Sequence, residues 1–259
     1  MRNALCAICI ALVSATCAGR DASMRRETTA IRPDSLVNFF RVCEQDSKNA
    51  IAVIVNRDIT KNLTHLQRMD GGGRKYYLLE REAITEMIRA VTSGLYDDFI
   101  LINRHGVVVY TMADDALFAK SVPASFKGTA LQECFEKTGT DLYLSDTGPS
   151  PGASERPVLY AAGRVVRDGE FHGVFLLQVR AERIARLIAE NESIVSRAGI
   201  VRISRNGIPA DAPYPDFERI APATLVEARS HRLTLPRAVL SYYPFTYKNL
   251  SWIIIARER

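Results

Sequence analysis

The stretch from Asp97 to Thr111, DDFILINRHGVVVYT, decides the fold. Two apolar runs, Phe99 to Ile102 and Val107 to Tyr110, flank the polar segment Asn103 to Gly106. Short apolar runs joined by a polar, glycine-containing connection predict a β-hairpin. Because both strands are apolar on both faces, the hairpin needs cover from helices on one side and from a pocket or a second layer on the other.

The composition is that of a globular protein, with 47% hydrophobic and 24% charged residues in a chain of 259. A chain of this length can bury one large core or two smaller ones. The net charge of +5 comes from lysines and arginines that are scattered among acids and form no dense block. This distribution argues against a nucleic-acid partner.

The N-terminus has the pattern of a signal peptide. Arg2 precedes an uncharged apolar run from Ala4 to Val13, and small residues follow as far as Cys17. The run is shorter than the ~20 residues of a membrane-spanning helix. Ser14 to Cys17 resembles a bacterial lipobox, in which Cys17 receives the lipid; the alternative is ordinary signal cleavage near Ala18. We therefore expect an extracytoplasmic, periplasmic protein held at a membrane by a lipid anchor.

Five segments follow one another along the chain. They are a signal peptide with its lipobox (1–17), a polar tether (18–33), a helical region (34–96), a first, membrane-distal module (97–190) and a smaller, membrane-proximal module (191–259). Apolar residues at helical spacing predict one helix from Asp34 to Gln67, which would be about 50 Å long. The Val53 to Val55 cluster leaves a strand as the alternative at that point.

The second module repeats the first. ILINRHGVVV, residues 100–109, is echoed by IVRISRNGIPA, residues 200–210, which places Gly207 opposite Gly106. The later strands are echoed as well: 158–162 by 239–243, and 173–179 by 250–256. A duplicated antiparallel module is the simplest interpretation. Shorter insertions predict the poorer pocket in the second copy.

The order of these elements resembles the double Cache family of extracytoplasmic sensor domains, in which two PAS-like modules lie along a long N-terminal helix. The resemblance covers most of Asp34 to Arg257. It rests on a helix pair leading into DDFILINRHGVVVYT, on PVLYAAGRVVRDGEFHGVFLLQVRAERI as a closing hairpin and exit helix, and on the terminal AVLSYYPFTYKNLSWIIIARER.

The resemblance implies an α+β fold in which a long N-terminal helix precedes two tandem PAS-like modules, each an antiparallel β-sheet with flanking helices. It also implies a small-molecule ligand in the first module. The quoted hairpin would then be the central ridge of the first sheet, with helices on one face and a ligand cavity on the other.

A ligand cavity needs apolar walls and a few polar groups that fix orientation. The candidates are strand and loop residues expected to face the cavity: Tyr110, Phe126, Tyr143, Ser145, Asp146, Thr147, Tyr160 and Arg164. Arg164 would pair with a carboxylate and Asp146 with an amine, although alternation along a strand turns half of such residues away. Amino-acid-binding family members carry Arg-x-Trp-Tyr where this chain has Phe126 to Thr129. The ligand class therefore stays open between an amino acid, an organic acid, an amine and a nucleoside.

The sequence gives little support to a catalytic, cofactor or metal site. His-Glu-x-x-His and the P-loop are missing, and the Cys-x-x-Cys formed by Cys6 and Cys9 belongs to the signal peptide. The Gly-x-Ser-x-Gly pattern at 148–152 lies in a Gly- and Pro-rich stretch that separates two predicted strands. We therefore predict that the protein is not an enzyme and uses no cofactor. The four histidines, at 65, 105, 172 and 231, are far apart, and His105 at the hairpin tip is expected to be solvated. Cys43 and Cys134 would either form a disulfide in an oxidising compartment or remain two buried thiols.

The functional hypothesis is a double Cache binding protein that senses a small molecule in its first module and signals through a membrane partner. A homodimer through the N-terminal helix is a further expectation. The alternative is a structural or protein-interaction lipoprotein that keeps the fold with a collapsed cavity. A hollow first module would favour the sensor.

Overall fold

The computed structural model describes residues 33–67, 74–151, 156–220, 222–227 and 229–258. The signal peptide, the lipobox Cys17 and the tether up to residue 32 lie outside the described residues. The helices are α1 (Asp34–Asn56), α2 (Ile59–Gln67), α3 (Arg74–Arg89), α4 (Val122–Ser125), α5 (Ala130–Lys137) and α6 (Ala181–Ala185), with 3₁₀ turns η2 (Phe217–Arg219) and η3 (Pro222–Val226). The strands are β1 (Asp98–Asn103), β2 (Val108–Thr111), β3 (Tyr143–Leu144), β4 (Gly148–Pro149), β5 (Pro157–Arg167), β6 (Glu170–Arg180), β7 (Glu192–Ser196), β8 (Val201–Ser204), β9 (His231–Leu235), β10 (Ala238–Tyr247) and β11 (Leu250–Glu258).

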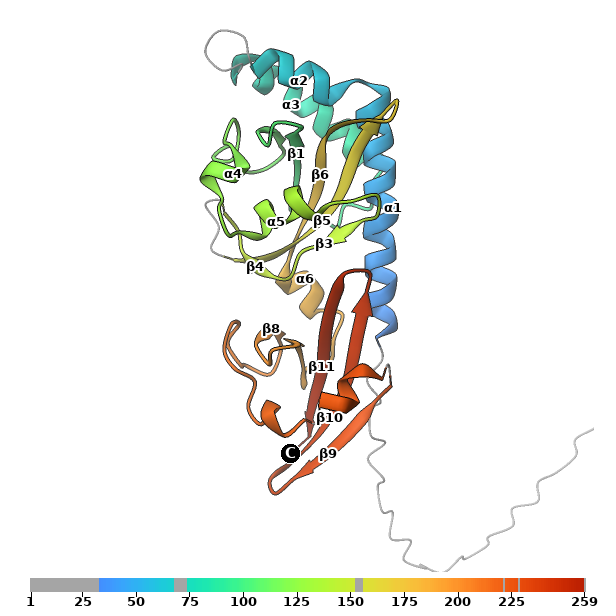
Figure 1. Cartoon of the computed structure of the whole chain (residues 1–259), viewed down its shortest axis with the longest axis vertical. Helices are drawn as coiled ribbons and strands as arrows, with labels where there is room; N and C mark the ends of the chain where they lie inside the picture. Colours follow the sequence, from blue (N-terminus) through green and yellow to red (C-terminus); the bar gives the residue numbers. More distant parts are fainter. Residues whose placement is uncertain (1–32, 68–73, 152–155, 221, 228, 259) are drawn as a thin grey trace, which may run out of the picture.

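Two antiparallel sheets follow one another along the molecule, beside α1 (Figure 1). The first sheet has the strand order β2-β1-β6-β5-β3, with β4 paired to β5, and the second has the order β8-β7-β11-β10-β9. Each sheet thus combines a short hairpin at one edge with a long hairpin beside it. The predicted duplication and the α+β fold class are confirmed.

The quoted hairpin forms as predicted, but at a sheet edge. Every residue of β1 and β2 is buried, and the Asn103 side chain closes the turn by accepting the N–H groups of His105 and Val107 at 3.0 and 3.1 Å. Gly106 takes a φ of 77°, which glycine adopts without strain, and His105 is exposed as expected. The central strand is β6, because its apolar run pairs with β1 on one side and β5 on the other.

The repeat is real, but the sequence match that revealed it had the wrong register. The N–H of Gly106 donates to the carbonyl of Asn103 at 2.9 Å, and the N–H of Gly199 donates to the carbonyl of Ser196 at 3.0 Å. Both ladders also shift register just before this turn. Gly106 therefore corresponds to Gly199 and not to Gly207.

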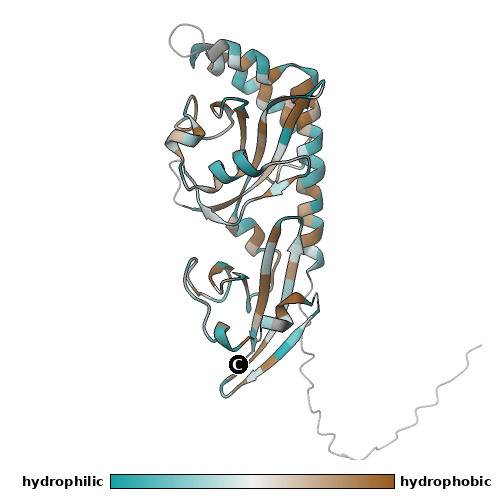
Figure 2. Cartoon of the chain, viewed as in Figure 1, coloured by the Kyte–Doolittle hydropathy of each residue, from teal (hydrophilic) through white to brown (hydrophobic). Residues whose placement is uncertain are grey.

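Helix α1 contributes to both modules because its apolar side chains face both sheets. Phe40 packs against Trp252 of the second sheet, with ring centroids 5.9 Å apart. Further along, α1 lies so close to β5 that a Cβ on Gly163 would be 2.5 Å from side-chain atoms of both Ile51 and Ser47. In Figure 2, α1 alternates between hydrophilic and hydrophobic residues, whereas the strands beside it are largely hydrophobic.

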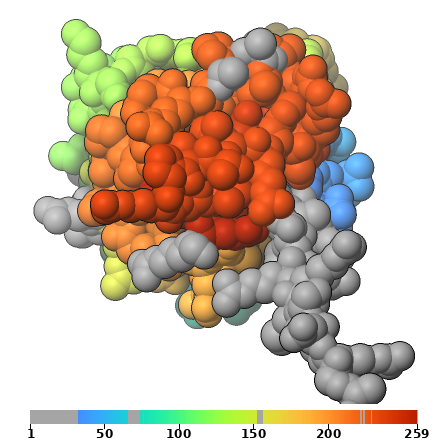
Figure 3. Space-filling model, turned by 90° about the horizontal axis from the view of Figure 1, so that it is seen from below, coloured from blue at the N-terminus to red at the C-terminus, as the bar shows by residue number. Residues whose placement is uncertain are grey.

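The predicted continuous helix from Asp34 to Gln67 is wrong, because the chain turns at Asp58. There φ is 53°, a left-handed conformation that ends a helix. α2 then crosses the end of the first sheet and contacts β1, β2 and β6. At the opposite end of the molecule, seen from below in Figure 3, the second module forms the surface, with α1 to one side.

Cys43 and Cys134, the two cysteines among the described residues, are free and buried, so the interpretation as buried thiols is confirmed. Cys43 belongs to the core between the first sheet and the helices, whereas Cys134 belongs to the core on the other face of that sheet. The sheet separates the two thiols, which excludes a bridge between them. Burial raises the pKa of Cys43 to about 12, which makes it a poor nucleophile.

The contact between α1 and the β10–β11 turn predicts acid-sensitive stability. Glu44 accepts hydrogen bonds from Lys48 at 2.8 Å, Tyr247 at 3.1 Å and Lys248 at 3.2 Å. The hydrogen bond from Lys48, aided by the other two, lowers the pKa of Glu44 from 4.5 to about 2. A carboxylate with a lowered pKa in the folded state contributes stability that is complete above its unfolded pKa and is lost as the pH falls through the folded pKa.

We therefore expect the free energy of unfolding to fall by on the order of 1–3 kcal/mol between about pH 5 and about pH 2 through this group. Urea denaturation across that window would measure the loss, and Glu44→Gln should remove this part of the pH dependence. A Glu44→Gln profile that parallels the wild type would contradict the assignment.

Candidate functional site

The first sheet has a helix-facing side and a second side that is covered by α4 and α5. This second side, which we term the cover face, carries a cluster of buried hydrophobic residues: Ile100, Ile102, Val108, Leu117, Val122, Phe126, Leu131, Cys134, Val158, Tyr160, Ala162, Val174 and Leu176. Their side chains occupy the space where the cavity was expected. The predicted ligand cavity on this face is therefore wrong, because apolar side chains from α4, α5 and the turn between them fill the space.

A band of polar side chains crosses the cover face at the end of the sheet nearest the second module. Asp98, Gln178 and Tyr160 lie directly opposite one another on β1, β6 and β5, so their side chains share one face. Ser145 joins them, because its Oγ accepts the N–H of Tyr160 at 2.9 Å. We call these four residues the polar row.

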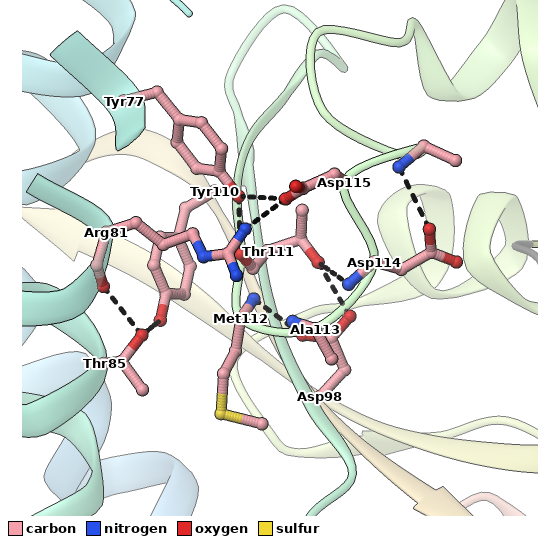
Figure 4. A network of polar contacts seen from close by, with 11 residues as sticks. Tyr77, Arg81, Thr85, Asp98, Tyr110, Thr111, Met112, Ala113, Asp114 and Asp115 are labelled. Carbon is pink, nitrogen blue, oxygen red and sulfur yellow. Dashed lines mark hydrogen bonds and ion pairs between the residues drawn. The ribbon is translucent and has the colours of Figure 1, made fainter. Parts of the chain in front are cut away.

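The carboxylate of Asp98 is 1% exposed and is held by the start of the loop after β2. It accepts hydrogen bonds from the Thr111 hydroxyl at 2.7 Å and from the N–H groups of Met112 and Ala113 at 2.7 and 2.9 Å (Figure 4). Burial nevertheless raises the pKa of Asp98 above its ordinary value. Burial also raises the pKa of Tyr160, so its hydroxyl stays protonated and can donate a hydrogen bond.

The same loop is tied to α3 by a network of side chains (Figure 4). The Tyr77 hydroxyl donates to the Thr111 carbonyl at 2.6 Å, and Arg81 pairs with Asp115. Tyr110 belongs to this side: its hydroxyl lies 2.7 Å from that of Thr85, and its ring packs in the helix-facing core. Tyr110 was predicted to face the ligand, but its place in the β2 ladder turns it toward α3 instead.

Three further predicted residues lie at or beside the cover face. Phe126 is part of the apolar cluster, and Ser145 is buried and bonded to Tyr160. Tyr143 packs against the cluster and donates a hydrogen bond from its hydroxyl to Glu133 of α5 at 2.7 Å. With Tyr160, the structure thus gathers four of the eight candidates around one face of the first sheet. Thr147 is buried just before β4, and its N–H donates to Asp146.

Asp146 is engaged in a link between the modules. Its Oδ1 accepts the indole N–H of Trp252 at 2.9 Å, and its Oδ2 lies 2.7 Å from Nε of Arg202. Nearby, Asn249 exchanges two hydrogen bonds with the backbone of Leu144, at 2.9 and 2.7 Å. The carboxylate expected to bind a ligand amine is thus occupied by the second module.

Arg164 is also apart from the polar row. Its guanidinium lies over the ring of Phe171, 4.5 Å from the centroid, and the residue is exposed. It lines a groove of about 370 Å³ between α1 and β5. The prediction that Arg164 shares a pocket with the other candidates does not hold, because it lies farther along β5, toward the opposite end of the sheet.

The histidines are closer together than their sequence positions suggest. His65, His105 and His172 all line one pocket of about 570 Å³ at the far end of the first sheet. No sequence motif indicated this convergence, which depends on α2 crossing the sheet. Asp98 is not among the residues predicted from the sequence, because its burial depends on hydrogen bonds from Thr111, Met112 and Ala113.

Two equivalent antiparallel sheets beside one long helix, with helices covering the second face of the first sheet, define a tandem PAS-like fold. The chain has the double Cache fold that its sequence resembles. Among the described residues, no helix has the length and apolar character needed to cross a membrane. No protein-family model and no curated protein matches the sequence.

Solved sensory domains share the fold at low sequence identity. The sensory domain of the Campylobacter jejuni chemoreceptor Tlp3 has a TM-score of 0.58 and 9% identity, with 87% of each chain covered. The ligand-binding domain of the Pseudomonas aeruginosa amino-acid chemoreceptor PctC, in complex with GABA, has a TM-score of 0.51 and 13% identity, with 87% of this chain and all of that chain covered. A domain of a putative sensory box/GGDEF family protein from Vibrio parahaemolyticus has a TM-score of 0.53 and 10% identity, with 86% and 88% covered.

Proposed function

We propose that the chain is an extracytoplasmic sensor module that binds a small molecule on the cover face of the first sheet. The observation that supports this function is the polar row at the edge of a buried apolar cluster. Apolar walls with a few oriented polar groups are the usual composition of a small-molecule site. Lipidation of Cys17 would hold the module at a membrane, beside the partner that receives its signal.

The ligand class that fits best is a small amino acid or a related amine or carboxylate. Tyr160 and Ser145 can donate hydrogen bonds to a carboxylate, and the carboxylate of Asp98 is suited to an ammonium group. The Tlp3 domain has been solved with L-valine and the PctC domain with GABA, ligands of this kind and size. A ligand screen should also include organic acids, amines and nucleosides, so that their binding can be compared with that of amino acids.

Binding on this face requires the cover to move. α4 has four residues and α5 has eight, and together with the turn between them they supply Val122, Phe126, Leu131 and Cys134 to the cluster. A ligand would therefore select a state in which these short helices are lifted from the sheet. The apparent affinity is then the intrinsic affinity of the open state multiplied by the fraction of molecules that are open.

The Tyr160 hydroxyl provides the test of this site. Tyr160→Phe keeps the ring and removes the hydroxyl, so we expect the affinity for a ligand that uses it to fall about tenfold, equivalent to ~1.4 kcal/mol. Thermal denaturation of the mature chain with amino acids, GABA, organic acids, amines and nucleosides would reveal the ligand, because binding adds about 2.7 kcal/mol at a concentration 100-fold above Kd.

The matched control is Tyr243→Phe, which removes a hydroxyl from a half-buried tyrosine in the second sheet. It should leave the ligand-induced shift unchanged. If no compound raises the unfolding temperature, or if Tyr160→Phe responds like the wild type, the proposed site is wrong.

The alternative is a protein-interaction module, and the filled cover face favours it. In that case the cluster around Phe126 and Leu131 is simply a core, and its polar edge holds strands and loops together. The screen separates the two functions: an interaction module would show no saturable stabilisation by any small molecule, whereas the sensor would show it with at least one.

A further inference from the structure

The pocket of about 570 Å³ lies at the end of the first sheet remote from the polar row. Asp98 and Asn103 are the two ends of β1, so roughly 17 Å of strand separates the polar row from the turn that borders the pocket. We call this cavity the distal pocket. Its volume is within the range of small-molecule sites, and nothing in the proposed function accounts for it.

Basic and imidazole side chains from three separate elements converge on the distal pocket. α2 contributes Lys61 and His65, the β1–β2 turn contributes Arg104 and His105, and β6 contributes His172. In the turn, Arg104 Nε donates to His105 Nε2 at 3.3 Å, which sets the two side chains next to each other. Glu170 is the acid among the described lining residues, so cationic groups outnumber it.

Lys61 and Arg104 have no carboxylate counter-ion among the described residues. None of the ion pairs between those residues involves Lys61 or Arg104, whereas nearby Arg167 is paired with Asp58. In the described part of the chain, no three His, Cys, Asp or Glu side chains are grouped so that they could hold a metal ion. The imidazoles are therefore placed to donate hydrogen bonds rather than to share a metal.

Thr60 supplies an independent observation that points to a ligand. It is 4% exposed, it lines the distal pocket, and its Oγ1 has no hydrogen-bond partner among the described residues. A buried hydroxyl without a partner costs about 1–3 kcal/mol. The neighbouring Thr64, by contrast, accepts a hydrogen bond from Asn103 at 3.4 Å. Thr60 is also in the first turn of α2, where the helix dipole favours a negative charge.

We propose that the distal pocket binds a small oxyanion, a molecule with a phosphate or carboxylate group. Lys61 and Arg104 would neutralise its charge, Thr60 would donate its hydroxyl to an anion oxygen, and imidazole N–H groups would complete the coordination. This site is separate from the polar row and does not depend on ligand binding there. Its occupant would join α2 to the β1–β2 turn and to β6.

Isothermal titration of the mature chain with inorganic phosphate and with citrate tests the proposal. We expect saturable binding of at least one of these probes, and the probe that binds identifies the group. The double variant Lys61→Gln, Arg104→Gln should weaken binding of the probe more than tenfold, since each lost charged contact is worth roughly 1.5–3 kcal/mol. Thr60→Val should weaken binding about fivefold, since a neutral hydrogen bond is worth about 1 kcal/mol. Tyr160→Phe should bind the probe like the wild type.

Lys127→Gln is the matched control, because Lys127 is exposed and lies on the loop after α4, outside the distal pocket. It should bind like the wild type. Circular dichroism of each variant confirms its fold. Unchanged binding by a folded Lys61→Gln, Arg104→Gln variant would overturn the proposal, as would the failure of both probes to saturate the wild type.

Discussion

Gly173→Ala is expected to destabilise the chain by about 4 kcal/mol or more, enough to unfold the first module at ordinary temperature. Gly173 begins the buried part of β6, where it lies opposite Asn103 of β1 and Val165 of β5. Its φ is 154°, and a Cβ added there would be 2.0 Å from the carbonyl oxygen of Ile102. Because the obstacle is backbone, no rotamer change can relieve it.

The consequence reaches the whole first sheet, because β6 is its central strand. Moving β1 away from Gly173 breaks the β1–β6 ladder at the end that carries the β1–β2 turn and the distal pocket. Chemical denaturation measures the loss, with Gly139→Ala as the matched control, since a Cβ at Gly139 has no heavy atom within 4 Å. A Gly173→Ala protein as stable as Gly139→Ala would show that β1 and β6 are farther apart than described.

The elements that depend on local pattern could be predicted from the sequence. Helix α5 (Ala130–Lys137) begins after Thr129, which accepts the N–H of Gln132 and is a residue type typical of an N-cap. The long hairpin turns over Asp168 and Gly169, which have φ values of 51° and 80°. These features depend on a few adjacent residues, and their turn chemistry is specific.

Features set by tertiary contacts could not be predicted in this way. The helical spacing of apolar residues continues past Asp58, so this spacing does not indicate the break between α1 and α2. The repeat was misaligned because Ser-Arg-Ala-Gly-Ile at 196–200 and Ser-Arg-Asn-Gly-Ile at 204–208 are nearly identical. Only the hydrogen bonds show that the first pentapeptide is the hairpin turn.

The candidate site was predicted at the level of the face rather than the residue. Alternation along β5 correctly placed Tyr160 on the cover face, but it could not show that side chains from α4 and α5 fill the space above it. The strand pattern also could not show that the carboxylate of Asp146 forms an ion pair with Arg202. A strand pattern gives the direction of a side chain, whereas its partner depends on elements distant in sequence.

Asp146→Ala is expected to uncouple the two modules. Trp252 is completely buried, and its indole N–H donates to Asp146 at 2.9 Å. Removal of the carboxylate leaves that donor unsatisfied and breaks the ion pair with Arg202, so we expect a loss of about 2–3 kcal/mol. The cooperativity of urea unfolding should fall as well, because the segment from β3 to β4 no longer holds the second sheet. Glu86→Ala, an exposed acid on α3, is the control.

The same contact allows the coupling to be observed directly, because Trp252 is the only tryptophan of the chain. Ser145 of the polar row is the residue next to Asp146, so a ligand that moves the polar row would shift the hydrogen bond to the indole and change the emission of Trp252. In Asp146→Ala, ligand binding should persist, measured by calorimetry, while the emission no longer responds. Asp146→Asn, which keeps an oxygen acceptor for the indole, should retain most of the response. If Asp146→Ala and the wild type give the same ligand-dependent emission, the signal does not pass through this contact.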